Sequence, residues 1–263
     1  MKPMLNSIFS CFLVLSFLGV QAQTLSNPTK DSIPSNPKSV ILKTNQEKIK
    51  DSIPAKVNRY GLRVGVDLFK LTRSFYDPEY KGIEFVGDYR LTKKHYLAAE
   101  IGNENKTTDD ARLNFTTKGT YLKAGFDYNG YTNWLNMENI ISIGLRYGVS
   151  TFNQELNSYK IYNPNPYFGE VSELISGQKS NGLSASWIEV VAGIKAKVIN
   201  NIYLGFSLRL NRLITNNKPD GFDNLYIPGF NRTYDGDFGV GFNYTVSYFI
   251  PIYKKKVSSV KSL

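Results

Sequence analysis

The sequence predicts an all-β protein, an eight-stranded antiparallel up-and-down transmembrane β-barrel. From residue 60 onward, apolar and polar residues alternate with a period of two, the pattern of strands with two unlike faces. The alternating segments number eight, and short connections between them alternate with longer ones, as in outer-membrane barrels. Aromatic residues make up 14% of the chain, a composition that favours β-structure.

Residues 1–22 have the order of regions that is typical of a secretory signal. Lys2 precedes an apolar run over 8–20, and small and polar residues follow, so we expect export and cleavage after Ala22. The single cysteine, Cys11, lies in this run, so the exported chain is expected to lack disulfides, cysteine-bound metals and thiol catalysis. No later stretch has the roughly 20 apolar residues of a membrane helix, so any insertion must use strands.

The segments on either side of the predicted barrel are polar. Residues 23–59 are rich in Ser, Asn, Pro and Lys, so a disordered linker is expected there. The last residues, 254–263, begin with three lysines and are expected to form a basic, solvated tail. The barrel itself is therefore expected over residues 60–253.

The eight strands are expected, in order, over about 62–68, 83–91, 97–102, 121–128, 141–149, 188–197, 202–211 and 238–250. They span six to thirteen residues, and most are near the ten that cross a bilayer at a tilt. We assign 92–95, 130–139 and 199–201 to short turns. Longer loops are expected over 72–80, 103–114, 153–182 and 215–235.

Glycine indicates which face of each strand points inward. Glycines such as Gly65, Gly125 and Gly205 fall on the charged face, where a narrow lumen needs small residues. A soluble lipocalin-type barrel would show the same alternation and is the alternative. Bases and acids on this face are nearly balanced, as charges removed from water must be. The predicted lumen charge network comprises Arg63, Asp67, Glu84, Asp88, Arg90, Glu100, Lys123, Asp127, Arg146, Glu189, Lys195 and Arg209. Interfacial girdles are expected from Tyr89, Tyr96, Tyr128, Tyr203 and Tyr248.

The net charge of +10, from 32 Lys and Arg against 22 Asp and Glu, is unevenly distributed. By the convention of outer-membrane barrels, the termini and short turns face the periplasm and the long loops face outward. The basic residues gather in the linker, turns and tail, whereas the long loops are net acidic. This basic periplasmic edge is suited to anionic lipid or an acidic protein partner, or is simply solvated. Export argues against nucleic acid as a partner.

The sequence offers little catalytic chemistry. Side chains are expected to fill an eight-stranded lumen, which excludes a bulk diffusion pore. The single histidine, His95, lies in a predicted periplasmic turn, so nucleophilic catalysis at the outer rim lacks its usual base and no enzyme is expected. No phosphate-binding or dinucleotide motif is present, and no cofactor is expected. Weak calcium candidates are Asp220, Asp223, Asp235 and Asp237, although Asp-Gly pairs are also common in tight turns.

Two long loops are richer in aromatic residues than free loops usually are. Aromatic and arginine side chains are enriched at protein contacts. The predicted partner-contact residues are Tyr162, Tyr167, Phe168, Tyr226, Phe230 and Arg232. The alternative is that these loops pack on each other over the mouth of the barrel.

Several runs carry a family resemblance. They include YGLRVGVDLFKL from Tyr60, KGIEFVGDYRLTKK from Lys81 and LYIPGFNRTYDG from Leu225. These runs resemble an uncharacterised family of Bacteroidota outer-membrane β-barrel proteins, a domain of unknown function, over about residues 58–253. The resemblance implies a small envelope barrel that is an accessory subunit of a larger outer-membrane complex, such as a barrel-assembly machine. Asp-Ser-Ile, which occurs twice, also resembles the bacterial O-glycosylation acceptor of the Bacteroidota, making Ser32 and Ser52 candidate glycan sites.

The residues therefore predict a non-enzymatic outer-membrane barrel of a Gram-negative bacterium that acts as an anchoring or accessory subunit. A carrier of a hydrophobic ligand, soluble or membrane-bound, is the alternative from another class. A lipid-modifying enzyme that uses a loop carboxylate such as Asp220 is the third.

Overall fold

The computed structural model describes residues 57–132, 138–161, 164, 167, 169, 173–219, 223–231 and 237–256. The predicted signal segment, nearly all of the linker, and both candidate glycan sites, Ser32 and Ser52, lie outside these ranges. So do the loop residues Tyr162, Phe168, Asp220, Arg232 and Asp235.

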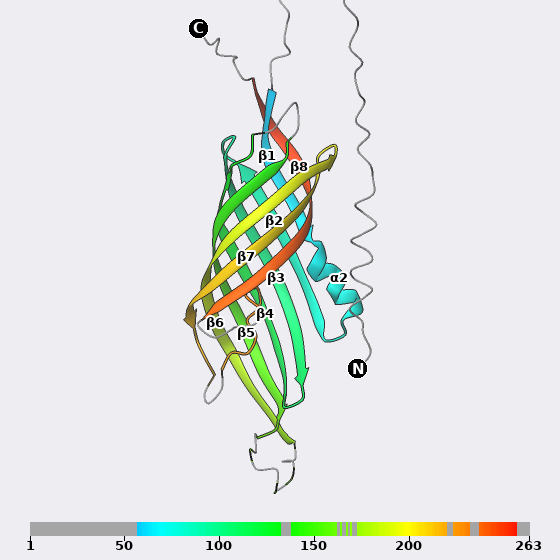
Figure 1. Ribbon diagram of the computed structural model, residues 1–263, viewed down its shortest axis with the longest axis vertical. Coiled ribbons are helices and arrows are strands. Elements are labelled where there is room, and N and C mark those ends of the chain that lie inside the picture. The colour runs from blue at the N-terminus through cyan, green and yellow to red at the C-terminus, as the bar shows by residue number, and fades with distance from the viewer. Residues whose placement is uncertain are drawn as a thin grey trace, which may run out of the picture. The chain divides into compact units, whose positions relative to one another are not determined.

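Eight antiparallel strands close into a barrel in which each strand pairs with its sequence neighbour and β8 pairs with β1 (Figure 1). The predicted up-and-down, eight-stranded architecture is confirmed. The strands are β1 (Val57–Asp67), β2 (Tyr80–Arg90), β3 (His95–Asp110), β4 (Leu113–Asn129), β5 (Ile140–Tyr159), β6 (Leu174–Ile199), β7 (Ile202–Asn216) and β8 (Phe238–Lys256). The one described helix, α2, spans Leu68–Tyr76.

We call the two ends of the barrel the turn end and the loop end. The turn end holds the start of β1, the end of β8 and the connections 91–94, 130–139 and 200–201. The loop end holds the connections 77–79, 111–112, 160–173 and 217–237. The orientation predicted from the sequence places the turn end in the periplasm.

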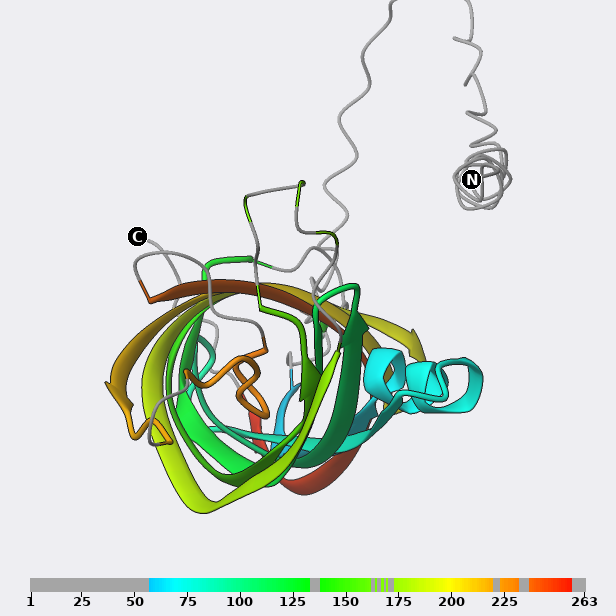
Figure 2. The same ribbon diagram turned by 90° about the horizontal axis from the view of Figure 1, so that it is seen from below.

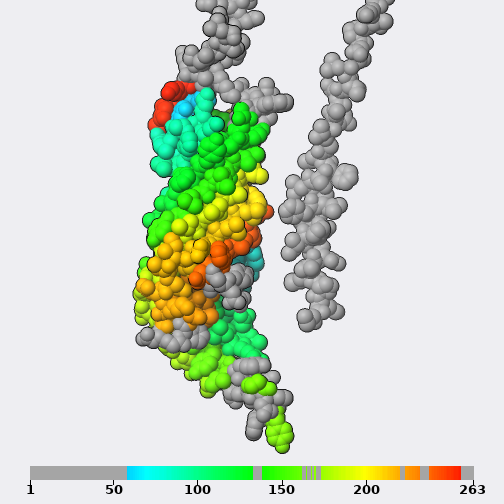
Figure 3. All heavy atoms as spheres, turned by 60° about the vertical axis from the view of Figure 1, so that its left-hand side comes forward, coloured from blue at the N-terminus to red at the C-terminus, as the bar shows by residue number. Residues whose placement is uncertain are grey.

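The outer wall of the barrel is apolar. One row of paired residues can be followed across all eight strands: Leu62, Tyr89, Leu97, Phe126, Leu145, Val190, Leu210 and Val240. Leu62 itself pairs with Ile250 of β8, ten residues beyond Val240, so the strands are strongly tilted. Figure 3 shows this tilt as oblique bands on one face of the barrel. The inner face carries the glycines and charges, which are described below.

The strands at the loop end are longer than the alternation predicts. Residues 103–114 were expected to form a loop, but β3 continues to Asp110 and β4 begins at Leu113, leaving a two-residue turn. Residues 103–110 are polar on both faces, so no apolar alternation marks them. They include Thr107 and Thr108, whose branched side chains suit a strand. At the turn end, Lys254–Lys256 extend β8 and pair with Val57–Arg59, so the tail does not begin at residue 254 as expected.

Helix α2 was not predicted from the sequence. Residues 68 and 72–80 were expected to be strand and loop, but β1 ends at Asp67, whose Oδ1 atom accepts hydrogen bonds from the backbone N–H groups of Phe69 and Lys70. An N-cap aspartate followed by good helix formers is a local start signal for a helix. The helix is too short to produce a clear helical period in the sequence. Within the described ranges, no helix is both long and apolar enough to cross a membrane.

The helix covers a gap in the barrel wall. Strand β1 pairs with β2 only over Leu62–Val66, and its pairing with β8 ends at Asp67. Beyond these points, towards the loop end, the first halves of β2 and β8 have no strand between them. Helix α2 packs there against both strands, beside the ring (Figure 2). Its Ser74 hydroxyl bonds to the backbone N–H and C=O of Gly82, so it satisfies part of the open edge of β2.

Candidate functional site

The middle of the lumen is filled by a neutral cluster of charged side chains. Arg209 donates to both oxygens of Glu100, at 2.6 and 3.0 Å, and also to Glu189 at 3.0 Å. Lys123 lies 2.9 Å from Glu189, and Arg146 lies 2.8 Å from Asp127. Three bases thus meet three carboxylates, and all six side chains are buried. Because buried charges persist only when paired, this cluster occupies the lumen as a structural unit.

A second cluster lies next to α2, on the loop-end side of the first. Lys70 of the helix reaches through the gap in the wall, and its Nζ atom lies 2.6 Å from Glu84 Oε2 and 2.9 Å from Glu104 Oε1. It also donates to the hydroxyl of Tyr121. The side-chain amide of Asn243 donates to both Asp67 and Glu84. One base faces three carboxylates here, so this cluster is acidic.

Residues 223–231 of the connection 217–237 fold back into the barrel. Of these, Tyr226, Ile227 and Phe230 are buried, and Figure 2 shows this segment inside the ring of strands. Glu104 Oε2 accepts hydrogen bonds from the Tyr226 hydroxyl at 2.7 Å and from the Gly229 N–H at 3.0 Å. We call residues 223–231 the plug.

Gly229 is required where the plug meets the wall. Its φ angle is +82°, and a Cβ atom there would lie 2.5 Å from the ring of Tyr121. The ring of Phe230 packs edge-on against Trp187, with their centroids 5.7 Å apart. The plug therefore closes the loop end of the lumen by close packing.

The position of the plug shows that two of the residues predicted to contact a partner lie inside the barrel. Tyr226 and Phe230 were expected to face a protein partner, but both point into the lumen, with 3% and 0% of their surface exposed. The alternative, in which the loops cover the barrel mouth, agrees with the structure of the plug. The reason is that the buried carboxylate of Glu104, absent from the predicted network, provides a hydrogen-bond partner for the Tyr226 hydroxyl. Among the predicted contact residues that the structure describes, only Tyr167 is exposed.

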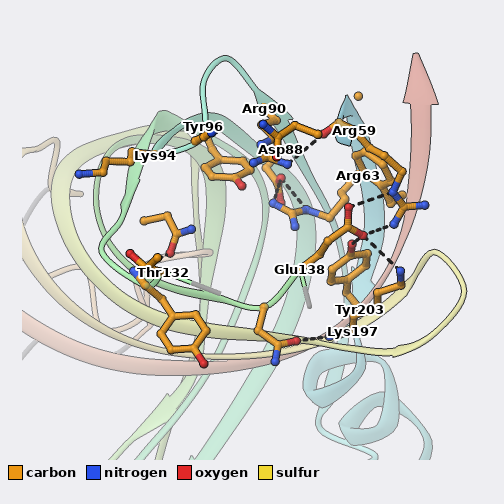
Figure 4. Close-up of a pocket in the computed structure, with 17 residues that line it drawn as sticks. Arg59, Arg63, Asp88, Arg90, Lys94, Tyr96, Thr132, Glu138, Lys197 and Tyr203 are labelled. Atoms are coloured by element: carbon orange, nitrogen blue, oxygen red, sulfur yellow. Dashed lines mark hydrogen bonds and ion pairs between the residues drawn. The ribbon is translucent and has the colours of Figure 1, made fainter. Parts of the chain in front are cut away.

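The turn end of the lumen is open and forms a cavity of about 460 Å³, which we call the cup (Figure 4). Residues from seven strands and two connections line it. They include Asn58, Arg59, Arg63, Asp88, Arg90, Lys93, Lys94, Tyr96, Asn129, Tyr131, Thr132, Glu138, Asn139, Lys197, Tyr203 and Phe249. Six bases and two acids are among them, so the cup is strongly basic.

Each of the two acids in the cup is shared by two bases. Asp88 accepts from Arg63 Nε at 2.7 Å and from Lys195 Nζ at 2.6 Å. Glu138 accepts from Arg59, and lies 3.2 Å from Lys197 Nζ. Both carboxylates are therefore already neutralised, and each group of three side chains has a net charge of +1.

Glu138 lies in the connection 130–139 and has a strongly perturbed pKa. Partial burial alone would raise its pKa. The hydrogen bond and charge of Arg59, followed by those of Lys197, outweigh burial and lower the pKa from 4.5 to about 2. The Tyr203 hydroxyl donates to the same carboxylate at 3.1 Å. Glu138 is therefore ionised throughout the physiological range.

Three further bases of the cup, Arg90, Lys93 and Lys94, have no carboxylate within 4 Å in the part of the chain that the structure describes. Arg90 donates from Nε to the carbonyl of Thr92 and from Nη1 to that of Arg59. Carbonyl groups orient the guanidinium but do not neutralise its charge. The charge along the lumen thus changes from acidic at the plug, through neutral at the centre, to basic in the cup.

The twelve residues of the predicted lumen charge network fall into three groups by their position in the barrel. Ten of the twelve lie in the acidic cluster, the central cluster or the buried Arg63–Asp88 pair, and Lys195 reaches Asp88 from a more exposed position. Arg90 lies at the rim without a carboxylate partner, which differs from its predicted place in a paired network.

Two tyrosines point the opposite way from the predicted interfacial girdle. Tyr96 and Tyr203 are buried in the lumen, where their rings lie 5.0 and 5.1 Å from the guanidinium carbon of Arg63. The prediction was wrong because a position near a strand end does not reveal the face on which a side chain lies. Tyr128 and Tyr248 do face outward.

Sequence reasoning missed Lys70 and Glu104 as lumen residues. Lys70 was placed in the strand-to-loop region and Glu104 in a loop, so neither was assigned a face. The Asp67 helix cap was the available signal for Lys70, because a residue three positions after the cap lies in the first turn of the helix. Nothing in the local pattern signalled the contact of Glu104 with the plug, which is 122 residues away at Tyr226.

The remaining predicted groups are not gathered into a site. His95 begins β3, and its Nδ1 atom lies 2.9 Å from the Thr92 hydroxyl within the turn. Asp223 lies 2.8 Å from the exposed Lys218, and Asp237 follows at the other side of the plug. Among the described residues, no three His, Asp or Glu side chains come together as a metal site. The larger apolar hollows in those residues lie on the outer wall, beside Leu210 and Phe126, rather than in the lumen.

Fold and site together define a closed eight-stranded β-barrel with an apolar outer wall, a charge-filled lumen and one open, basic end. The chain belongs to the family described as Domain of unknown function (DUF6048), whose profile matches residues 4–255. This confirms the expected membership of an uncharacterised family. A comparison with curated proteins gave no match.

Two solved structures are similar in architecture. Ail, the attachment invasion locus protein of Yersinia pestis, shares 9% identity over 73% of this chain and 97% of its own, with a TM-score of 0.36. CarO2 of Acinetobacter baumannii shares 11% identity over 74% of this chain and 100% of its own, with a TM-score of 0.33. At these scores no property of either protein transfers to this chain.

Proposed function

We propose that this protein is an outer-membrane β-barrel of a Gram-negative bacterium, exported through a cleaved signal, that conducts no bulk solute. In this proposal it serves as a non-enzymatic anchoring or accessory subunit of an envelope complex. The observation that carries the proposal is the inverted distribution of polarity, with apolar side chains on the outer wall and paired charges inside. The resemblance of the sequence to a Bacteroidota family supports a host in that group.

The outer wall supports insertion in a bilayer. Ile143, Leu208 and Val240 are 58%, 53% and 62% exposed, and similar side chains project from the outer face of every strand. Soluble proteins rarely expose apolar patches of more than a few hundred Å². A soluble carrier barrel would reverse the pattern, with its apolar face inside around a ligand. The charged lumen of this barrel therefore favours the membrane protein over the hydrophobic-ligand carrier.

The lumen supports the absence of a diffusion pore. The central cluster and the plug lie in series between the cup and the loop end. A solute would have to break the ion pairs of Arg209 with Glu100 and Glu189, and also displace Phe230 from its contact with Trp187. A static, filled lumen leaves the ends of the barrel as the surfaces on which a function can act.

An anchoring or accessory role follows from where those surfaces lie. The turn end carries the open cup and the lysines that end β8, so it is the basic end predicted to face the periplasm. An acidic protein partner in the periplasm is the complementary surface. Barrel assembly is one process in which such a subunit could take part, as the family resemblance implies.

The membrane and pore statements can be tested on the native protein. Cell envelopes are extracted with alkaline carbonate, and the purified barrel is reconstituted in a planar bilayer at several protein concentrations. We expect the protein to remain in the membrane pellet and the bilayer to show no stepwise conductance. Release into the carbonate supernatant would refute membrane insertion, and reproducible conductance steps would refute the filled lumen.

The accessory role requires a separate experiment. A tagged copy is purified from detergent-solubilised envelopes, and the proteins that elute with it are identified by mass spectrometry. We expect a stoichiometric envelope protein that is lost when Lys254, Lys255 and Lys256 are changed to Gln, whereas Lys81→Gln with Lys118→Gln at the other end leaves it bound. A barrel that elutes alone would refute the subunit role.

A further inference from the structure

The cup has the dimensions of a small-molecule site. Its volume of about 460 Å³ lies within the range of roughly 300–1,000 Å³ that ligand pockets occupy. Its walls come from around the barrel, from Arg59 of β1 to Lys197 of β6 and Phe249 of β8, so it is a hollow in the lumen rather than a groove on the surface. Figure 4 shows Arg59, Arg63, Asp88 and Glu138 close together on one side of this hollow, with the Lys94 side chain extending away from them.

The charge of the cup is not balanced by the described chain. Asp88 and Glu138 are each held by two bases, so neither is available to Arg90, Lys93 or Lys94. A concave site lined by one sign of charge concentrates counter-ions of the other sign. The net positive charge of the cup therefore favours the binding of an anion.

Two arginines of the cup, one at the floor and one at the rim, are held in place before any ligand binds. Arg63 lies between the rings of Tyr96 and Tyr203 and is bonded to Asp88. Arg90 is bonded to two carbonyls, and its guanidinium carbon lies 5.1 Å from the ring of Tyr60. Side chains that are already ordered lose less entropy on binding, so they favour affinity and selectivity.

The chain itself shows that this lining recognises a carboxylate. Arg59, Lys197 and Tyr203, from three different strands, all direct donors to the carboxylate of Glu138. An arginine fork combined with a point-charge lysine is also a common arrangement for binding phosphate and carboxylate groups. On the other side of the cup Arg90, Lys93 and Lys94 provide the same donor types with no acid among them.

We propose that the cup is a binding site for a small soluble anion that carries phosphate or carboxylate groups. Arg90 and Lys93 bind the charged group, Lys94 adds positive charge at the rim, and the neutral side chains of the wall contact a polar body. The wall supplies amides and hydroxyls for that purpose, among them those of Asn58, Asn129 and Thr132. A phosphorylated or carboxylated sugar has this combination of groups.

The position of the cup argues for a soluble ligand. The cup opens along the barrel axis inside the ring of strands, whereas the acyl chains of a bilayer lipid would have to lie against the outer wall. The inference takes from the proposed function only that the turn end meets the periplasm, which sets the source of the anion. The site itself rests on the geometry of the purified barrel.

The test is calorimetric titration of the folded, detergent-solubilised full chain at an ionic strength of about 0.1 M. The probes are inorganic pyrophosphate, N-acetylmuramic acid, and N-acetylglucosamine as a neutral sugar. We expect saturable binding of at least one of the two anions and no binding of the neutral sugar. Because one charge-assisted hydrogen bond contributes a factor of about ten or more, the triple variant R90Q/K93Q/K94Q should weaken binding by at least about tenfold.

The control removes the same number of charges from the loop end. Lys81→Gln, Lys118→Gln and Lys160→Gln together should leave the affinity within about twofold, because long-range charge is screened beyond roughly 10 Å. Both variants are checked for the compact, heat-modifiable band of a folded barrel on electrophoresis, and single substitutions replace the triple variant if it does not fold.

Three outcomes would overturn the proposal: no binding of either anion, equal loss of affinity in both variants, or equal binding of the neutral sugar. Failure of the proposed function is distinguishable from these results. A protein released by alkaline carbonate that still binds an anion through Arg90 would refute the membrane assignment and leave the anion site intact. A barrel that stays in the membrane pellet but binds neither anion would refute the anion site and leave the membrane assignment intact.

Discussion

Replacing Lys70 with methionine tests the role of helix α2 in closing the barrel wall. Methionine is of similar length and apolar, so it can occupy the same channel through the gap while removing the charge. In the native protein the Lys70 ammonium lies 2.6 Å from Glu84 and 2.9 Å from Glu104, and its side chain is only 10% exposed. The variant leaves both carboxylates buried with no base in contact.

The expected loss follows from the burial of both partners. Glu84 and Glu104 are fully buried, so neither can be solvated without opening the wall. Removing one partner of a buried ion pair costs about 3–5 kcal/mol, because it leaves an uncompensated charge. This corresponds to a decrease of roughly two to three and a half orders of magnitude in the folding equilibrium constant. The hydrogen bonds of Tyr121, Tyr226 and Gly229 to these carboxylates keep the loss near the lower bound.

The measurement is reversible urea unfolding of the barrel in phospholipid vesicles, followed by tryptophan fluorescence. The double variant Lys70→Met, Glu84→Gln should recover part of the loss, since it removes one of the two buried carboxylates that have lost their base. Lys81→Met, on the exposed side of β2, serves as the control and should change stability by less than about 0.5 kcal/mol. A loss below about 1 kcal/mol for Lys70→Met, or no recovery in the double variant, would refute the view that this lysine latches the helix across the gap.

Three further predictions concern the plug, the outer wall and the cup. Gly229→Ala should destabilise the barrel by about 1–3 kcal/mol, because the new methyl group meets Tyr121 at a positive φ angle, and loop 217–237 should become more sensitive to protease. Leu145→Arg should cost about 2–4 kcal/mol in vesicles if this row lies at the bilayer midplane. Glu138→Gln should lower stability at neutral pH and remove an acid-dependent step. The depressed pKa of Glu138 stabilises the native state above pH 4.5, and this contribution is lost as the pH falls towards about 2.

Each of these has its own contradicting result. An unchanged cleavage rate in Gly229→Ala would mean that the plug can relax around Tyr121. Equal stability of Leu145→Arg and wild type in vesicles would place that row outside the hydrocarbon. Wild type and Glu138→Gln should converge in stability on acidification, and parallel curves between pH 7 and pH 2 would contradict the assigned pKa.

The barrel and the identity of its inner face could be predicted because both depend on a local, repeating property. Alternation along each strand is set by backbone geometry, so a residue such as Arg146 and its neighbour Leu145 must lie on opposite faces. The same reasoning does not hold where the alternation stops. The polar ends of β3 and β4 carry no such signal. The prediction for Tyr96 and Tyr203 failed because it used their position near a strand end, whereas alternation with the outward Leu97 and Leu204 places both tyrosines inside.

The sequence alone therefore determined the class of fold, the order and pairing of the strands, and most of the charges that enter the lumen. Only the tertiary structure decided how the ends of the lumen differ. The plug depends on Tyr226 and Gly229 meeting Glu104, and the wall is completed by Lys70 reaching Glu84, contacts between segments that no local pattern relates. The basic cup depends on which bases find acids, a matter of three-dimensional distance rather than composition. Local periodicity gives a side chain its face, but pairing across the lumen determines its partner.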